Sequence, residues 1–215
     1  MDRRYDAVLF DLLTALLDSW TLWNRVAGNP EDGKRWRTAY LRNTYGVGRY
    51  RTYETLVVEA AEEAGLPRRL ADDLAAGYAA LEPWPEAPSV LSAVSSVLPV
   101  GIVTNCSERL GSTAAGRTGT NFAVIVTAER AGFYKPHPLP YQIALDSLGV
   151  SAERCLFVAG SPYDLFGTKK LGLPAYWHDR IGMTAPQDVP APIWHEKTLT
   201  PLLAVLGLAA APGSG

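Results

Sequence analysis

A set of side chains spread over four segments of the sequence suits covalent catalysis by a carboxylate. Asp11 ends an apolar run, where an ionised carboxylate is costly to desolvate unless it is paired or takes part in a reaction. A hydroxyl–amide pair, an ammonium, a second carboxylate and a serine hydroxyl accompany it: Thr104-Asn105, Lys135, Asp164 and Ser161. An aspartate in such surroundings can act as a nucleophile. The chemistry first indicated is therefore attack by Asp11 on a small substrate.

These residues follow short apolar runs that alternate with helical segments. The runs predicted as strands are residues 5–10, 100–103, 122–126, 155–159 and 175–177, and those predicted as helices are 90–97, 108–115, 139–148 and 163–171. This alternation predicts an α/β fold, a Rossmann-like parallel sheet flanked by helices. Because parallel strands end at the same edge, the polar residues should meet where ligands bind in such sheets.

A long helical stretch without a convincing strand separates the first strand from the others. Helices are predicted at residues 20–26, 31–45, 53–64 and 67–81, and the Pro-rich segment 82–88 is a stiff connector. The sequence therefore predicts an α/β core of residues 1–14 and 88–208. A helical cap of residues 15–87 is inserted into it, and residues 209–215 are a flexible tail.

The composition is typical of a globular protein, either an enzyme or a binding protein. Of the 215 residues, 47% are hydrophobic and 20% are charged, and the net charge is −2. This charge gives no electrostatic case for nucleic acid or an anionic membrane. No run reaches the roughly 18 apolar residues of a membrane helix. Two cysteines are too few for a disulfide framework, so we expect a cytoplasmic protein. From the charge and the absence of a long apolar run we expect no nucleic-acid or membrane partner.

The order of the four segments resembles a known enzyme family. Asp11 after its strand, Thr104 in VTN, Lys135 in YKPHP and Asp164 in VAGSPYD are similar to the four motifs of the haloacid dehalogenase superfamily. The resemblance covers nearly the whole chain and includes a cap between the first two motifs. Finer matches resemble the L-2-haloacid dehalogenases: Trp36-Arg37, Leu41, Gly48-Arg49-Tyr50 and Tyr141 six residues after Lys135.

The resemblance implies a mechanism with an enzyme–ester intermediate on a small organic acid. Asp11 would displace halide from a 2-halo acid, and water would then hydrolyse the ester. Lys135 would keep Asp11 ionised, Thr104 and Asn105 would position oxygens, and Asp164 would orient Lys135 or the water. The residues expected to contact the substrate are Arg37 as anion clamp, Asn105, Tyr141, Ser161 and Leu13. This mechanism requires no cofactor, and the related dehalogenases indicate a homodimer.

Departures from the family pattern keep two other functions open. Phosphatases of this superfamily protonate the leaving alcohol with an aspartate two residues after the nucleophile, and Leu13 has no proton to give. Gly160 occupies the position of one of their metal-binding acids. If magnesium binds, Asp11, Asp164 and the carbonyl of Leu13 would hold it. The alternatives are a magnesium-dependent phosphatase or phosphotransferase, and a non-catalytic binding protein of the same fold.

Several of these residues also have an ordinary structural interpretation. Ser161 to Asp164 matches a helix capping box, in which the serine hydroxyl accepts from the third helical amide. Arg37 lies in a basic cluster that would suit a solvated helix face. Trp20, Trp23 and Trp36 would pack inside the cap, and Cys106 would be a buried thiol. These interpretations stay open at the level of sequence.

Overall fold

The computed structural model describes residues 3–208, and its centre is a sheet of six parallel strands. Their order is β3-β2-β1-β4-β5-β6. The strands are β1 (Ala7–Phe10), β2 (Val100–Thr104), β3 (Val124–Thr127), β4 (Cys155–Ala159), β5 (Ala175–His178) and β6 (Trp194–Glu196). The predicted α/β fold is therefore confirmed, while β6 was not predicted. The predicted tail, 209–215, lies outside the described residues.

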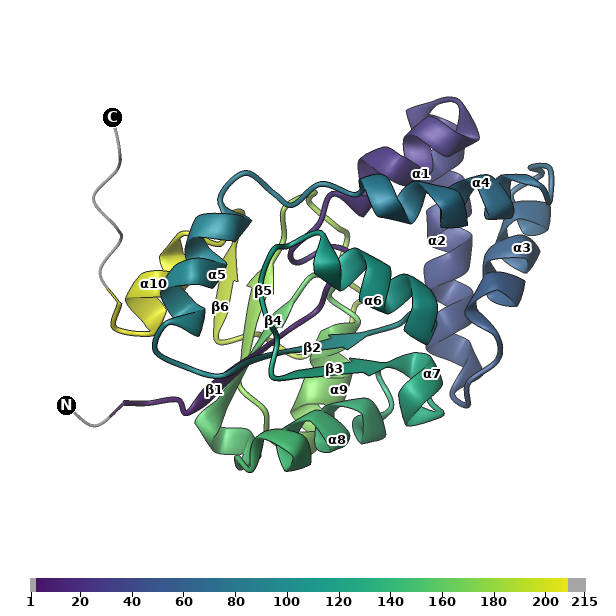
Figure 1. Cartoon of the computed structure of the whole chain (residues 1–215). Helices are drawn as coiled ribbons and strands as arrows, with labels where there is room; N and C mark the ends of the chain where they lie inside the picture. Colours follow the sequence, from purple (N-terminus) through teal and green to yellow (C-terminus); the bar gives the residue numbers. More distant parts are fainter. Residues whose placement is uncertain (1–2, 209–215) are drawn as a thin grey trace.

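Strand β1 lies at the middle of the sheet and is buried on both faces. Val8 and Phe10 pack into a core with helices on one face, whereas Ala7 and Leu9 pack into the core of the opposite face. This alternation follows from the two-residue period of a strand. The first face carries α5 (Ala87–Ser95), α6 (Glu108–Gly116) and α10 (Pro201–Val205); the second carries α8 (Pro138–Leu148) and α9 (Asp164–Leu171) (Figure 1).

The order of the strands places a topological switch point beside β1. The chain runs from β1 to β2 on one side of it, and β4 pairs with β1 on the other side. Ligands of open α/β sheets bind at the carboxyl ends of strands at such a point. Asp11 directly follows β1, and its amide donates to the carbonyl of Val158 at 2.9 Å. The sheet therefore holds Asp11 at the expected ligand position.

Four helices between β1 and α5 form a separate group beyond the ends of the strands (Figure 1). We call them the cap helices: α1 (Ser19–Ala27), α2 (Pro30–Val47), α3 (Tyr53–Glu63) and α4 (Leu70–Gly77). A 3₁₀ turn, Tyr78–Ala80, follows α4, so the predicted helix 67–81 is shorter and ends in a tighter turn. Three further short elements outside the prediction are α7 (Ala128–Ala131), the 3₁₀ helix Ala152–Arg154 and α10.

The chain passes between the sheet and the cap helices through two segments that lie side by side. Leu17 and Pro83 form an antiparallel bridge, and the amide of Asp18 donates to Glu82 at 2.8 Å. The indole of Trp84 donates to the carbonyl of Thr14 at 2.8 Å. The Pro-rich connector thus contacts the segment that follows Asp11. The division of the chain into a core and a cap at residues 14 and 88 stays a prediction.

Helix α2 is the long cap helix that faces the sheet edge, and its start is encoded locally. Asn29 accepts a hydrogen bond from the amide of Asp32 at 2.9 Å, and Pro30 occupies the first turn. Both are favourable at a helix N-terminus. Residues 28–30, predicted to separate two helices, therefore also cap the second one. The cap fixes where α2 begins and so which residues it presents to the sheet.

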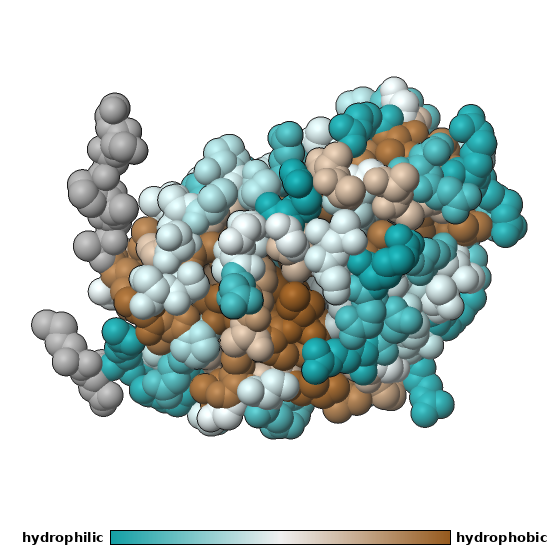
Figure 2. All heavy atoms as spheres, viewed as in Figure 1, coloured by the Kyte–Doolittle hydropathy of each residue, from teal (hydrophilic) through white to brown (hydrophobic). Residues whose placement is uncertain are grey.

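The outer surface of the cap helices is mostly polar. Figure 2 shows hydrophilic side chains over the right-hand side of the molecule, where Figure 1 places α2, α3 and α4, with smaller apolar areas among them. This matches an amphipathic arrangement, in which the apolar side of each helix packs inward. Within residues 3–208, no helix has the length and apolar character needed to cross a membrane.

Candidate active site

The carboxylate of Asp11 is held by the turn that follows β1. Its Oδ2 accepts hydrogen bonds from the amides of Thr14 at 3.2 Å and Ala15 at 3.4 Å. The side chain is largely enclosed, since the residue is 8% exposed. One oxygen of Asp11 therefore faces two backbone donors, which can also stabilise negative charge that develops on that oxygen.

Gly160 packs directly against this turn, and only a glycine fits there. A Cβ at this position would lie 2.6 Å from Asp11 Oδ2 and 2.4 Å from the amide nitrogen of Ala15. Such contacts would displace the carboxylate or its amide donors. The absence of an acid at Gly160 thus has a steric reason in this chain, because any side chain would disturb Asp11.

Lys135 joins the two carboxylates of the site. Its Nζ lies 2.8 Å from Asp11 Oδ1 and 2.9 Å from Asp164 Oδ1, and the residue is 2% exposed. Burial alone lowers the pKa of Lys135, but the two carboxylates outweigh it, so the net pKa is raised. The ammonium therefore stays charged and favours the ionised form of Asp11.

Asp164 is completely buried at the start of α9. Burial raises the pKa of Asp164 to about 6, against the opposing effect of Lys135. Its Oδ2 has no hydrogen-bond partner among the described residues. A carboxylate with such a pKa and a free oxygen is suited to accept a proton near neutral pH.

Thr104 and Asn105 come from the end of β2 and have different surroundings. The Asn105 side chain bonds the backbone of Lys135 twice, accepting from its amide at 2.7 Å and donating to its carbonyl at 3.1 Å. The hydroxyl of Thr104 is buried without a hydrogen-bond partner among residues 3–208. Asn105 thus positions the loop of Lys135, whereas the Thr104 hydroxyl has capacity left for another group.

Arg37 is a buried cation on α2. It is 3% exposed, donates to the hydroxyls of Ser19 at 2.7 Å and Thr14 at 2.9 Å, and stacks on Trp20 with 4.4 Å between guanidinium and ring centre. In the described part of the chain no carboxylate lies within ion-pair distance of it, and its Nε has no partner. Burial lowers its pKa. The expectation of a solvated basic face is wrong for Arg37.

These side chains border one small cavity, which we call the site cavity. Its volume is about 30 Å³, room for roughly one or two water molecules. Seven of the residues predicted for the site line it: Asp11, Leu13, Arg37, Thr104, Asn105, Lys135 and Ser161. Asp164 and Tyr141 lie behind them. The cavity also has walls that the sequence analysis did not propose as site residues: Thr14, Tyr40, Leu41 and Tyr45.

The spacing of the cavity residues on α2 could have identified them from the sequence. Tyr40, Leu41 and Tyr45 follow Arg37 by three, four and eight positions, the spacing of one helix face. Tyr40 donates to the carbonyl of Asn105 at 2.8 Å, and Tyr45 donates to the hydroxyl of Ser161 at 3.2 Å. The face that carries Arg37 therefore also joins the cap helices to the strand ends.

Tyr141 and Ser161 have structural partners in addition to their place near the site. Tyr141 is buried and donates to the backbone carbonyl of Asp164 at 3.3 Å. The Ser161 hydroxyl accepts from the amide of Tyr163 at 3.3 Å, and α9 begins only at Asp164. The capping-box interpretation is therefore wrong in its geometry, since the carboxylate of Asp164 pairs with Lys135.

The sequence matches the family described as haloacid dehalogenase-like hydrolase over residues 5–172. The chain belongs to this family. The predictions of the superfamily and of a hydrolase are confirmed by this match. The fold, with its helices around a parallel sheet and Asp11 at the switch point, is the framework in which the family's motifs come together here.

Named members of the family resemble this chain over most of its length. It is similar to haloacetate dehalogenase H-2 of Moraxella sp. (strain B), with 26% identity over 201 residues, 84% of this chain and 88% of that protein. It is also similar to (S)-2-haloacid dehalogenase H-109 of Pseudomonas putida, with 26% identity over 82% of this chain and 87% of the other. The structure of L-2-haloacid dehalogenase from Xanthobacter autotrophicus with chloropropionic acid covalently bound has the same fold. Its TM-score is 0.84 at 21% identity, over 95% of this chain and 100% of that one.

The oxygen groups expected to hold magnesium are arranged for other contacts. The ammonium of Lys135 lies between the carboxylates of Asp11 and Asp164, and the hydroxyl of Ser19 donates to the carbonyl of Leu13. Among the described residues, no cluster of three or more His, Cys, Asp or Glu side chains could hold a metal ion. Magnesium needs near-octahedral oxygen ligands. This donor set does not fit it.

Proposed function

We propose that the protein hydrolyses 2-halo carboxylic acids with Asp11 as the nucleophile. The observation that carries the proposal is the buried guanidinium of Arg37, which borders the cavity of Asp11 and has no carboxylate within ion-pair distance among the described residues. A buried charge without a partner is costly, and the carboxylate of a substrate would supply the missing partner. The relatives named for haloacetate and (S)-2-haloacid dehalogenation support this substrate class.

In the first step of the proposed reaction, the Asp11 carboxylate attacks C2 of the acid. The carbon–halogen bond breaks, halide leaves with the bonding electron pair, and an ester forms between Asp11 and C2. Lys135 keeps Asp11 ionised for this attack, and Arg37 holds the substrate carboxylate. Halide needs no proton to leave, so the apolar Leu13 is compatible with the step.

In the second step, water attacks Cγ of the Asp11 ester. The oxygen that faces the amides of Thr14 and Ala15 carries the developing charge. Asp164 accepts the proton that the water loses, a role supported by its free Oδ2 and its pKa of about 6. On collapse the bond between Cγ and the ester oxygen breaks, and the departing oxygen on C2 takes the proton back from Asp164 to give the 2-hydroxy acid. The new carboxyl group of Asp11 loses the second water proton, which restores the carboxylate. The sum is 2-halo acid plus water giving 2-hydroxy acid, halide and a proton.

This proposal requires no cofactor. The phosphatase alternative needs an acid two positions after Asp11, where Leu13 stands. It also needs a magnesium site, and the oxygen donors around Asp11 do not fit magnesium. General acid catalysis is typically worth about 10²–10⁴-fold, so its loss would leave a slow phosphatase. The contact of Gly160 with Asp11 further argues against a second metal-binding acid there.

Halide release from racemic 2-chloropropionate is the experiment that tests the proposal. We expect release by the wild-type protein, no effect of EDTA, and loss of activity in Asp11→Asn. A panel of phosphate esters with magnesium runs in parallel. Metal-dependent phosphate release would contradict the proposal, and a lack of turnover on both panels would favour the non-catalytic binding protein.

Two predictions about the surroundings of the protein accompany this function. The homodimer follows from the resemblance to dehalogenases, and the cytoplasmic location follows from the low cysteine content. Light scattering on the purified protein measures the first, and cell fractionation measures the second.

A further inference from the structure

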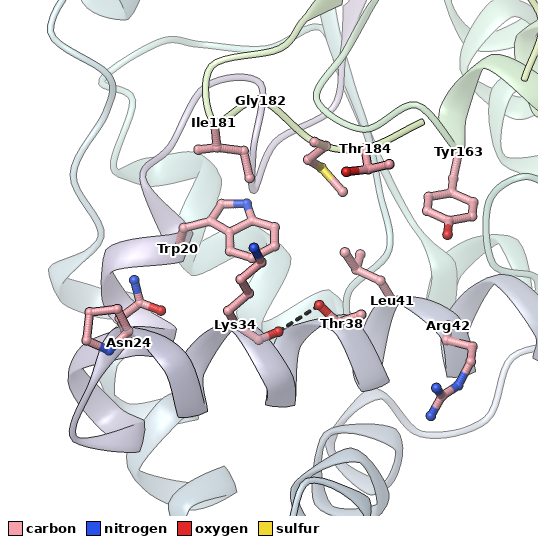
Figure 3. A pocket seen from close by; sticks show the side chains of 12 residues that line it. Trp20, Asn24, Lys34, Thr38, Leu41, Arg42, Tyr163, Ile181, Gly182 and Thr184 are labelled. Carbon is pink, nitrogen blue, oxygen red and sulfur yellow. Dashed lines mark hydrogen bonds between the residues drawn. The ribbon is translucent and has the colours of Figure 1, made fainter. Parts of the chain in front are cut away.

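A larger groove lies next to the site cavity, between the cap helices and the core (Figure 3). Its volume is about 570 Å³. Trp20 of α1 and Leu41 of α2 border it on the cap side, and Tyr163, Ile181 and Met183 border it on the core side. The groove is thus formed where two parts of the chain face each other, a common location for small-molecule sites.

Only a thin wall separates the groove from the site cavity. Leu41 lines both spaces. On one side of it, Trp20 of the groove stacks on Arg37 of the cavity at 4.4 Å, and on the other Tyr163 of the groove stacks on Tyr45 of the cavity at 4.3 Å between ring centres. Leu41 is shared by the two spaces, and its aliphatic side chain can change rotamer without losing a hydrogen bond.

The groove combines large apolar side chains with polar and basic ones, and its described walls carry no negative charge. In Figure 3, Ile181 points toward Trp20, and Leu41 points into the space between Trp20 and Tyr163. Ile181 is 37% exposed, one of two large hydrophobic side chains in the described residues that are exposed. None of the described residues that line the groove is acidic, and Lys34 adds a positive charge at the wall. An anion with an apolar chain would find complementary surroundings here.

We propose that this groove binds the apolar chain of a 2-substituted carboxylic acid of about six to eight carbons, an inference that rests on the proposed function. The site cavity has space for little more than the reacting groups, at about 30 Å³. The chain beyond C3 therefore needs other space, and the nearest lies across Leu41. The carboxylate and C2 meet Arg37 and Asp11, while the chain passes Leu41 and lies against Trp20 and Ile181.

Calorimetric binding of octanoate and propionate tests the groove without requiring turnover, because neither acid carries a halogen. Burial of roughly two methylene groups is worth about tenfold in affinity, so the wild-type protein should bind octanoate at least about tenfold more tightly than propionate. Thr38→Phe fills the groove from the exposed side of α2. We expect this variant to lose the preference for octanoate and to keep its affinity for propionate.

Ser147→Phe is the matched control. Ser147 on α8 and Thr38 on α2 are both exposed, and each donates its hydroxyl to the carbonyl four residues earlier at 2.7 Å. The control loses the same bond and gains the same ring away from the groove, so it should keep the preference. Circular dichroism verifies that both variants fold. The ratio of octanoate to propionate affinity in the wild-type protein tests the proposal without any variant.

The outcomes separate this inference from the proposed function. Equal affinity of the wild-type protein for the two acids overturns the groove, and so does a preference that survives in Thr38→Phe. Halide release from 2-bromooctanoate and 2-bromopropanoate is measured alongside. If octanoate binds in the groove and neither halo acid releases halide, the groove stands and the dehalogenase proposal fails. If halide is released from 2-bromopropanoate alone and octanoate binds no more tightly than propionate, the dehalogenase proposal stands and the groove proposal fails.

Discussion

The two sides of the site cavity differ in how their charges are balanced. On the core side, Lys135 lies within 2.9 Å of both Asp11 and Asp164, so each buried charge has an opposite partner. On the cap side, Arg37 is equally buried, but the groups that contact its guanidinium are neutral: two hydroxyls and the rings of Trp20 and Trp23. The buried charges of the core side are therefore in direct contact with a charge of opposite sign, and the buried charge of the cap side is not.

This difference indicates which groups act on the substrate and which recognise it. A paired set of charges holds a nucleophile and a base in defined ionisation states before anything binds. The desolvation free energy of a buried cation without an ion-pair partner stays uncompensated until an anion binds next to it. Loss of Lys135 on the core side should thus reduce catalysis and stability together, whereas a substitution of Arg37 should reduce binding with little loss of stability.

After replacement of the nucleophile Asp11 itself, the largest expected effect is that of Asp164→Asn. Loss of a proton acceptor should lower kcat for halide release by about 10²–10⁴-fold. Because burial raises the pKa of Asp164 to about 6, wild-type kcat should rise with pH through about 6, and the variant should lack this rise. A profile of kcat against pH measures both. An unchanged inflection in the variant would assign it to another group.

The same group gives a stability prediction with a definite sign. The pKa of Asp164 in the folded protein lies above the ordinary value of 3.8, so the folded state binds more protons between about pH 4 and 6. The contribution of Asp164 to the free energy of unfolding therefore falls as pH rises through this window. Denaturant titrations of the wild type and Asp164→Asn at several pH values would show it as a difference in slope.

Lys135→Met should have the next largest effect, because it leaves two buried carboxylates facing each other. Removal of one member of a buried pair costs about 3–5 kcal/mol in the free energy of unfolding. Halide release should fall at least about 100-fold, since Asp11 loses the group that holds it. Thermal unfolding and the halide assay measure the two losses. Retained stability would show that the charges of the core side are not mutually balanced.

Arg37→Met should show the reverse pattern. Hydrogen bonds to charged groups contribute about 1.5–3 kcal/mol, so KM for a 2-halo acid should rise about 10–100-fold. The free energy of unfolding should change by no more than about 1 kcal/mol, because the variant also removes a buried charge without a counter-ion. Steady-state kinetics and denaturant unfolding test the pair of expectations. A stability loss as large as that of Lys135→Met would contradict the proposed difference between the ion-paired core side and the cap side.

Gly160→Ala should have the smallest effect of the four substitutions. Its Cβ would lie 2.4 Å from the amide nitrogen of Ala15, so the turn around Asp11 has to shift. Overpacking of this kind costs about 1–3 kcal/mol, and we expect roughly a tenfold loss of kcat. Gly46→Ala is the control, because no atom outside its own helix lies within 4 Å of the new Cβ. In α2 that change should leave activity intact and raise stability by up to about 1 kcal/mol.

The fold was predictable because its signals are local. The alternation of apolar runs with helical segments identified β1 to β5. Strands joined through helices run parallel, and the twist of the strands makes such connections right-handed. Strand β6 has three residues, of which Trp194 and Glu196 are half-buried and His195 is exposed, so it carries no apolar run to detect. Helix α4 is shorter than its pattern because Pro67 begins a turn, and the helix itself starts at Leu70.

For the candidate site, the sequence alone determined which residues stand together at the sheet edge. Asp11, Thr104 and Asp164 follow apolar runs, and parallel strands bring such ends together whatever the details of packing. The tertiary structure decided the rest: that Arg37 is buried without a counter-ion, that Gly160 touches Asp11, and that Leu41 separates the site cavity from a larger groove. These are distances between segments remote in sequence, and they depend on how the cap helices pack against the strand ends. No local pattern encodes that packing.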